Sequence, residues 1–176
     1  MLGCFMLGYG DYQRWLYRDG RPNRVARLKD RASVELLKAG ISPHRTAVLS
    51  VQGRRTGLIV SLPVIVTACQ GDRYLVSMLG ESNWVRNVRA ADGRAVLRRR
   101  RSEAVRLIEV PVRDRAPVLR RYVAASPGAR AHIGVSRRAP AAEFEALAAD
   151  LPVFRVTAAV SAADERHLWR EPVFRN

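Results

Sequence analysis

The first stretch of regular hydrophobic spacing lies in residues 21–39. Val25, Leu28 and Leu37 recur there at roughly helical intervals, and Gly40 follows as a stop. The spacing predicts an amphipathic helix that packs on the outside of a sheet.

The period changes after residue 45, where β-branched residues become frequent. The segments 46–52 (TAVLSVQ) and 58–69 (LIVSLPVIVTAC) have strand composition, and the sequence GRRTG at 53–57 separates them. Its two glycines can adopt backbone conformations with positive φ, so the two segments are predicted to form a hairpin. A second turn at 70–73 leads into a third strand over 74–79. Three consecutive strands favour an antiparallel sheet or barrel.

A short helix is predicted in the middle of this β region, over residues 81–93. Ser82 or Asn83 can cap its N-terminus, and Asp92 with Gly93 ends it. The apolar stripe of this helix consists of Trp84, Val85 and Val88.

The rest of the pattern completes a six-stranded fold. It predicts strands over 94–99 and 103–110, helices over 114–126 and 140–150, and a last strand over 152–158. Strands and helices do not alternate regularly, which argues against a Rossmann fold. The predicted fold class is α+β, a mostly antiparallel six-stranded barrel with flanking helices. We expect one domain over 1–176, with an N-terminal helical extension (1–43), a barrel core (44–158) and a C-terminal tail (159–176).

The composition is that of a soluble globular protein, with 48% hydrophobic and 27% charged residues. No apolar run approaches the roughly 20 residues needed to cross a bilayer. The N-terminus lacks a basic region and soon reaches Asp11, so it makes a poor signal peptide, and we expect a cytoplasmic protein. The apolar N-terminus leaves a weak peripheral membrane association open, although stable anchoring needs two signals.

The net charge of +15 raises the question of nucleic-acid binding. Lys29 and Lys38 are the only lysines, and an arginine-rich, alanine-rich composition is typical of a GC-rich genome. The densest basic run, Arg98 to Arg101, is predicted to be a solvated hairpin tip. Aromatic residues make up only 7% of the chain, which disfavours a surface that stacks bases. No nucleic-acid partner is therefore expected.

The sequence gives little evidence of a metal site or of a catalytic nucleophile. Cys4 and Cys69 are isolated, and His44, His132 and His167 are scattered, so no metal site is predicted. The sequence contains no nucleophile elbow, no Walker loop and no dinucleotide-binding glycine pattern. Catalytic residues therefore stay unassigned.

The GRRTG turn is either a hairpin turn that happens to be basic or a turn that binds an anion such as a phosphate. Arg54 and Arg55 offer guanidinium groups and Thr56 a hydroxyl, a donor set suited to a phosphate or carboxylate. The segment 77–87 (SMLGESNWVRN) is the other candidate, because free backbone N–H groups at a helix N-terminus favour an anion. Trp84 and Asn87 share a helix face there, either as stacking and hydrogen-bonding groups or as a core anchor and a surface residue.

These motifs occur in a recognisable order. The GRRTG turn, a strand with SLPV at 61–64 and then GDRYLVSMLGESNWVRNVRA at 71–90 resemble the deazaflavin-dependent nitroreductase family of split β-barrel oxidoreductases. The resemblance covers about residues 44–158. It implies a split barrel that binds coenzyme F-420, whose phosphate and oligoglutamate tail are anionic, and transfers a hydride between the reduced coenzyme and a small electrophile. Such acceptors are nitro compounds, quinones and activated alkenes.

The resemblance also implies which residues bind the cofactor. Arg54, Arg55 and Thr56 would meet the phosphate and tail, and the loop Ser77, Met78, Leu79 and Gly80 would follow the ring. The site would be closed by Ser82, Asn83, Trp84 and Asn87.

The chain departs from the family pattern in three places. Leu58 and its two successors stand where members carry a basic residue, and Val85 and Arg86 replace an aromatic residue and a histidine. Arg86 could reach the anionic tail instead. The substrate-side tyrosines have no match in 128–136, where His132 is the polar aromatic candidate, so nitroreductase activity itself is not implied.

Three alternatives stay open beside the deazaflavin enzyme. FMN could occupy the same site in a related split-barrel oxidoreductase, a non-catalytic carrier could hold a cofactor or lipid there, and a nucleic-acid-binding barrel is disfavoured as argued above. Both a monomer and a homodimer are compatible with the sequence.

Overall fold

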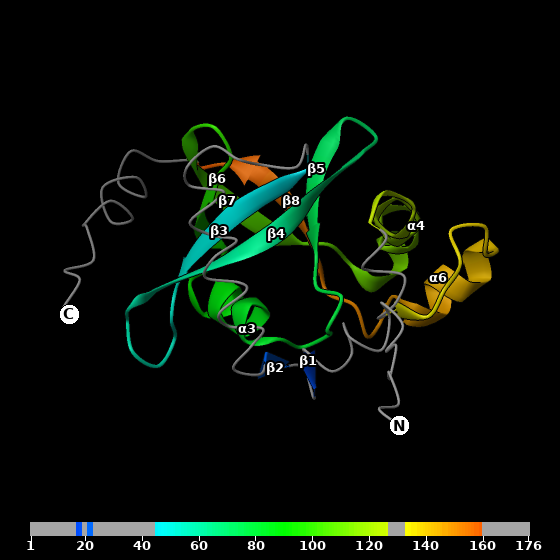
Figure 1. Cartoon of the computed structure of the whole chain (residues 1–176), viewed down its shortest axis with the longest axis horizontal. Coiled ribbons are helices and arrows are strands. Elements are labelled where there is room, and N and C mark those ends of the chain that lie inside the picture. The colour runs from blue at the N-terminus through cyan, green and yellow to red at the C-terminus, as the bar shows by residue number, and fades with distance from the viewer. Residues whose placement is uncertain (1–16, 19–20, 23–44, 127–132, 160–176) are drawn as a thin grey trace, which may run out of the picture.

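The computed structural model describes residues 17–18, 21–22, 45–126 and 133–159. Its centre is a closed barrel in which neighbouring strands follow the order β3-β4-β5-β8-β7-β6 and every pair is antiparallel (Figure 1). The predicted fold class is confirmed. The strands are β3 (Thr46–Gln52), β4 (Ile59–Cys69), β5 (Asp72–Val76), β6 (Arg94–Arg98), β7 (Ser102–Glu109) and β8 (Val153–Ala158).

The long strand β4 turns a corner of the barrel. Its residues 59–65 pair with β3, and its residues 66–69 pair with β5. Pro63 has no N–H to donate to a ladder, and it lies in the first part, where only β3 is paired with the strand among the described residues. A proline is tolerated there because one side of the strand needs no ladder bond.

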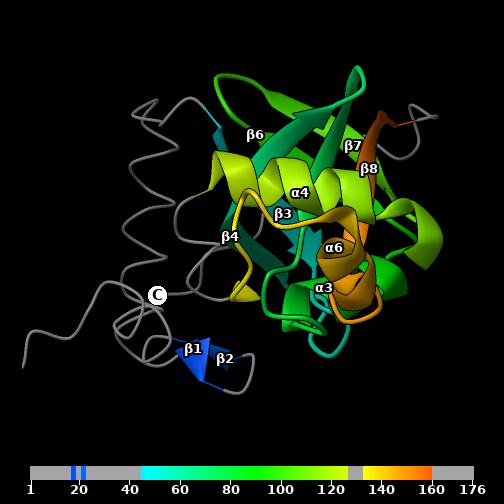
Figure 2. The ribbon, with the colours of Figure 1, turned by 90° about the vertical axis from the view of Figure 1, so that its right-hand side faces the viewer.

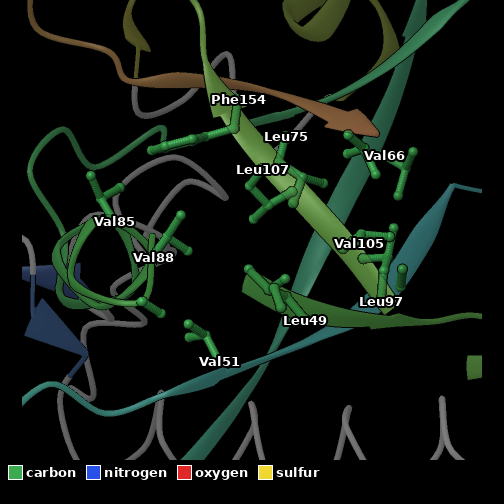
Figure 3. Close-up of a cluster of buried hydrophobic side chains, with 14 residues drawn as sticks. Leu49, Val51, Val66, Leu75, Val85, Val88, Leu97, Val105, Leu107 and Phe154 are labelled. Atoms are coloured by element: carbon green, nitrogen blue, oxygen red, sulfur yellow. The ribbon is translucent and has the colours of Figure 1, made fainter. Parts of the chain in front are cut away.

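Alternate residues of every strand fill the barrel interior, and helix α3 (Asn83–Ala90) closes one end of it. Figure 3 shows Val85 and Val88 of this helix pointing toward the strand residues Leu107 and Phe154. Val85 and Val88 are fully buried. The apolar stripe predicted for this helix is therefore the plug of the barrel.

A second apolar layer lies outside the barrel. The short 3-10 helix η1 (Val112–Asp114), helix α4 (Ala116–Ala125) and helix α6 (Ala141–Leu147) follow one another there. Figure 2 shows α4 lying across the barrel with α6 beside it. Their buried side chains pack against the outer faces of β4, β5 and β8, away from the barrel interior.

Arg115, at the start of α4, joins this layer to the barrel. Its side chain is only 7% exposed. The guanidinium donates to the main-chain carbonyls of Val110 (2.8 Å), Ala148 (2.9 Å) and Leu151 (3.3 Å), and to a carboxylate oxygen of Glu109 (2.9 Å). A buried charge is tolerated here because its donors meet oxygen acceptors.

Glu109 also binds a second arginine. Arg89 donates to both oxygens of Glu109, at 2.7 and 2.8 Å, and to Glu81 at 2.8 Å. The hydrogen bonds from Arg89, with help from Arg115, hold the pKa of Glu109 below its ordinary value. The network ties α3 to the end of β7 and the start of α4.

This network predicts a pH dependence of stability. A carboxyl group whose folded pKa is depressed stabilises the fold above its unfolded pKa, here about 4.5, and loses that contribution as the pH falls through the folded pKa. The variant Glu109→Gln should therefore be less stable than the wild type at neutral pH, and the difference should shrink on acidification. Urea unfolding of both proteins from pH 7 to pH 3 measures it, and a difference that does not change with pH would contradict the assignment.

Some element boundaries differ from the sequence-based predictions. Arg21 and Pro22 form a two-residue strand, β2, paired with β1 (Tyr17–Arg18), so the helix predicted from residue 21 is wrong at its start. Its remainder, 23–39, lies outside the described residues. The third barrel strand covers 72–76 rather than 74–79, because the chain turns at Ser77. The second of the outer helices ends at Leu147, three residues early.

Candidate functional site

The GRRTG turn is a compact loop with its own hydrogen bonds. The Gly53 N–H donates to the Leu58 carbonyl and the Gly57 N–H to the Gly53 carbonyl, both at 2.8 Å. Gly57 has a φ of 71°. Gly53 has no positive φ, but a Cβ there would make a tight contact of 3.0 Å with the Leu58 carbonyl oxygen. The two positions thus favour glycine for different reasons. Only Gly57 has the positive φ that was predicted for both glycines.

The turn is bound to the N-terminal half of α3. The backbone N–H of Arg54 donates to Oδ1 of Asn87 at 3.3 Å, and its Nη1 donates to the same oxygen at 2.8 Å. The guanidinium also reaches Asn83, at 3.4 Å to both the main-chain oxygen and Oδ1. Two segments about 30 residues apart in sequence therefore meet at one end of the barrel. Arg54 is a bridge between them, and much of its donor capacity is already used.

Asn87 is 6% exposed, so its interpretation as a surface residue is wrong. The amide faces inward because its oxygen accepts two hydrogen bonds from Arg54, which offset its desolvation. Trp84 is half-buried and packs against the barrel core, with its ring 5.5 Å from that of Phe154. The core-anchor reading of Trp84 thus holds for part of its surface.

The loop between β5 and α3 is held by two buried hydroxyl groups. Ser77 Oγ donates to the Gly80 carbonyl at 2.7 Å and lies 3.0 Å from Ser82 Oγ. Ser82 stands at the N-cap position as predicted, but its side chain makes no cap hydrogen bond because it pairs with Ser77. Gly80 has a φ of 63° and packs against the Asp150 carbonyl. Both serine hydroxyls serve the loop itself.

The N-terminus of α3 is consequently open. No side chain caps it and no acidic residue lies in its first turn. The first backbone N–H groups of a helix have no intrahelical acceptor, and the helix dipole makes this end positive. An anion placed against Asn83 and Trp84 would therefore be stabilised.

Exposed cations and exposed apolar groups occur on the turn and the start of β4, and α3 carries a further exposed cation. The side chains of Arg55 and Arg86 are exposed, and within the described part of the chain neither has an ion-pair partner. Thr56 is exposed as well, and its hydroxyl oxygen accepts a bond of 3.3 Å from the Leu58 N–H. Leu58 is 66% exposed and Val60 is 42% exposed. Cationic and apolar surface thus adjoin at the turn, which suits a ligand with an anionic end and a flat apolar body.

The structure adds little about three further predicted site residues, Met78, Leu79 and His132. Met78 packs against the outer apolar layer and Leu79 is half-buried. His132 lies outside the described residues. Two cavities, of about 640 Å³ and about 300 Å³, contain none of the predicted site residues among the described residues that line them. Among the described residues no three His, Cys, Asp or Glu side chains gather as metal ligands, and no described helix has the length and apolarity to cross a membrane.

One feature of the surface was not found by sequence reasoning. A cavity of about 640 Å³ beside α4 and α6 is lined by Arg113, Arg120, Arg121 and Arg137. Three of these arginines recur at i, i+7 and i+8, a helical spacing that was visible in DRAPVLRRYVAAS and its preceding residue. The fourth comes from a different segment, and only the packing of α6 brings it near.

No protein-family model matches the chain, and no curated protein matches it. A search of solved structures finds a partial likeness to an F-420-H2 dependent reductase, with 17% identity over 65% of this chain and 95% of that chain and a TM-score of 0.47. A FAD-binding protein from Mesorhizobium loti is 13% identical over 70% of this chain and 87% of that chain, with a TM-score of 0.43. A protein of unknown function from Agrobacterium tumefaciens is 16% identical over 68% of this chain and 54% of that chain, with a TM-score of 0.47.

Proposed function

We propose that this chain is an oxidoreductase that binds a flavin-like cofactor, coenzyme F-420, at the GRRTG turn and the start of α3. The observation that carries the proposal is the junction in which Arg54 ties the turn to Asn83 and Asn87. It holds an exposed basic turn beside an open helix N-terminus. The same two motifs carry the resemblance to the deazaflavin-dependent nitroreductase family.

The donor set at this junction fits an anionic cofactor. Arg55 and Arg86 supply guanidinium groups that no carboxylate occupies in the described structure, and the α3 N-terminus supplies backbone N–H groups. The exposed side chains of Leu58 and Val60 offer apolar contact for a ring system. Arg54 positions the turn, and Ser77 and Ser82 fix the loop. Their roles are therefore structural support of the site.

When bound, a reduced deazaflavin supplies a hydride to an electrophilic acceptor, and the difficult chemistry belongs to the cofactor. The residues of this chain would hold the anionic end through Arg55 and Arg86 and orient the ring against the apolar part of the turn. Trp84, fixed by its contact with Phe154, would exclude water from the face of the ring that it covers. The acceptor class that suits such a site is a quinone, a nitro compound or an activated alkene.

Fluorescence titration with oxidised coenzyme F-420, with FMN in parallel, tests the proposal. We expect saturable binding of the deazaflavin by the wild type and a loss of affinity of about tenfold in Arg55→Ala, the size of one charge-assisted hydrogen bond. Arg54→Ala should weaken binding and also lower the melting temperature, because the bridge to α3 is lost. Arg100→Ala, at the exposed β6–β7 tip, removes the same charge and should change neither.

Each other outcome has a definite meaning. Unchanged affinity in Arg55→Ala would make the turn purely structural. Binding of FMN alone would favour the FMN-dependent alternative. Binding without oxidation of the reduced coenzyme by a quinone or a nitroarene would favour a carrier, and binding of neither cofactor would overturn the proposal.

A further inference from the structure

A second basic surface lies on the other layer of the molecule, in the groove of about 640 Å³ beside η1, α4 and α6. The two helices pack against each other there (Figure 2). The apolar part of the groove lining is made mostly of small side chains, which leave it open: Ala116, Pro117, Ala124, Ala141 and the edge of the buried Phe144.

Four arginines from two segments line this groove. Arg113, Arg120 and Arg121 come from η1 and α4, and Arg137 comes from the segment before α6. One carboxylate, that of Glu145, lines the groove with them. Among the described residues, four cations against one anion give the groove lining a net positive charge.

Within the part of the chain that the structure describes, most of this positive charge makes no ion pair with a carboxylate. Within the described residues, Arg120, Arg121 and Arg137 have no ion-pair partner, and Arg113 makes only a contact of 3.8 Å with its neighbour Asp114. Guanidinium groups that repel one another around one cavity are stabilised when an anion is placed among them. An anion bound in this groove would therefore gain charge-assisted hydrogen bonds from guanidinium groups that no carboxylate of the described residues pairs with.

We propose that this groove binds an organic anion that carries at least two negative charges, as phosphate or carboxylate groups, on a small body. The cavity volume lies within the range of about 300–1,000 Å³ typical of small-molecule sites. Guanidinium groups match phosphate and carboxylate oxygens in pairs, and the alanine-rich lining contacts an apolar body. A nucleic-acid strand fits less well, because Phe144, the one aromatic residue among the described lining residues, is 1% exposed and cannot stack with a base.

This site is separate from the proposed cofactor site, since its lining contains no residue of the GRRTG turn or of α3. It stands whether or not the chain binds a deazaflavin.

The test titrates the full chain with citrate and with tripolyphosphate by calorimetry, at low and moderate salt, and maps the binding surface by amide NMR shifts. We expect saturable binding that weakens with salt, with the largest shifts in 113–124 and 137–145 and not in 53–57. The double variant Arg120→Gln/Arg137→Gln should lose at least tenfold in affinity. Citrate and tripolyphosphate together distinguish a carboxylate from a phosphate preference.

A matched variant separates a built site from general charge. Arg100→Gln/Arg101→Gln removes two charges from the exposed β6–β7 tip and should change the affinity by less than twofold. Equal weakening by both double variants, or no saturable binding of either probe, would overturn the proposal. Binding of a single-stranded 16-nucleotide DNA that depends on Arg120 and Arg137, without binding of the small anions, would also overturn it in favour of a nucleic-acid surface.

Discussion

Arg115→Met is expected to lower the free energy of unfolding by about 3–5 kcal/mol. Methionine keeps much of the apolar stem of the arginine but has no N–H to donate. The carbonyls of Val110, Ala148 and Leu151 would lose their donor from this side chain in a buried environment, and Glu109 would lose one of its two cations. Because Arg115 joins α4 to these groups at the end of β7 and in the segment between α6 and β8, the outer helical layer should loosen from the barrel.

Urea unfolding followed by circular dichroism measures this loss. Arg113→Met is the matched control, since the Arg113 side chain is 84% exposed and its substitution should change the free energy of unfolding by no more than about 0.5 kcal/mol. A loss below about 1 kcal/mol in Arg115→Met would show that water or rearranged neighbours replace the arginine easily.

Gly93→Ala is expected to cost about 3 kcal/mol, which combines left-handed backbone strain with overpacking. Gly93 has a φ of 75°, and a Cβ there would lie 2.5 Å from the Leu107 carbonyl oxygen. That oxygen belongs to a central barrel strand and cannot move as a flexible side chain would. The melting temperature should fall by about 6–12 °C.

Gly71→Ala is the control that separates strain from overlap. Gly71 has a φ of 86°, but no atom lies within 4 Å of the position of its Cβ. Its substitution should cost only the backbone strain, about 1–2 kcal/mol. If the two alanine variants melt at the same temperature, the close approach of α3 to β7 at Gly93 is not what requires glycine there.

In the proposed cofactor site, some residues position the turn and others bind the ligand, and this difference affects how the variants are interpreted. Arg54 is predicted to bind the anion, and in the structure it also bridges the turn to α3 through its hydrogen bonds to Asn83 and Asn87. A double replacement of Arg54 and Arg55 would therefore mix two effects. Single variants with a stability measurement distinguish positioning of the turn from binding of the ligand.

The sequence by itself determined the barrel strands and the helix that closes the barrel. β-branched alternation between glycine-containing turns placed β3 and β4 to within one residue, and Asp92 with Gly93 predicted the turn that follows α3, although the helix ends at Ala90 and not at 93. These features are local: backbone conformation and period depend on neighbouring residues, so a single sequence carries them.

Only the tertiary structure decided which polar groups satisfy one another. The bond from Arg54 to Asn87 joins residues 33 apart, and the buried guanidinium of Arg115 finds an acceptor 36 residues away. The pairing of Ser77 with Ser82 likewise left the α3 N-terminus open, although the sequence placed a capping residue there. Hydrogen-bond partners of this kind are set by barrel closure and helix packing, which bring together side chains that no local period relates.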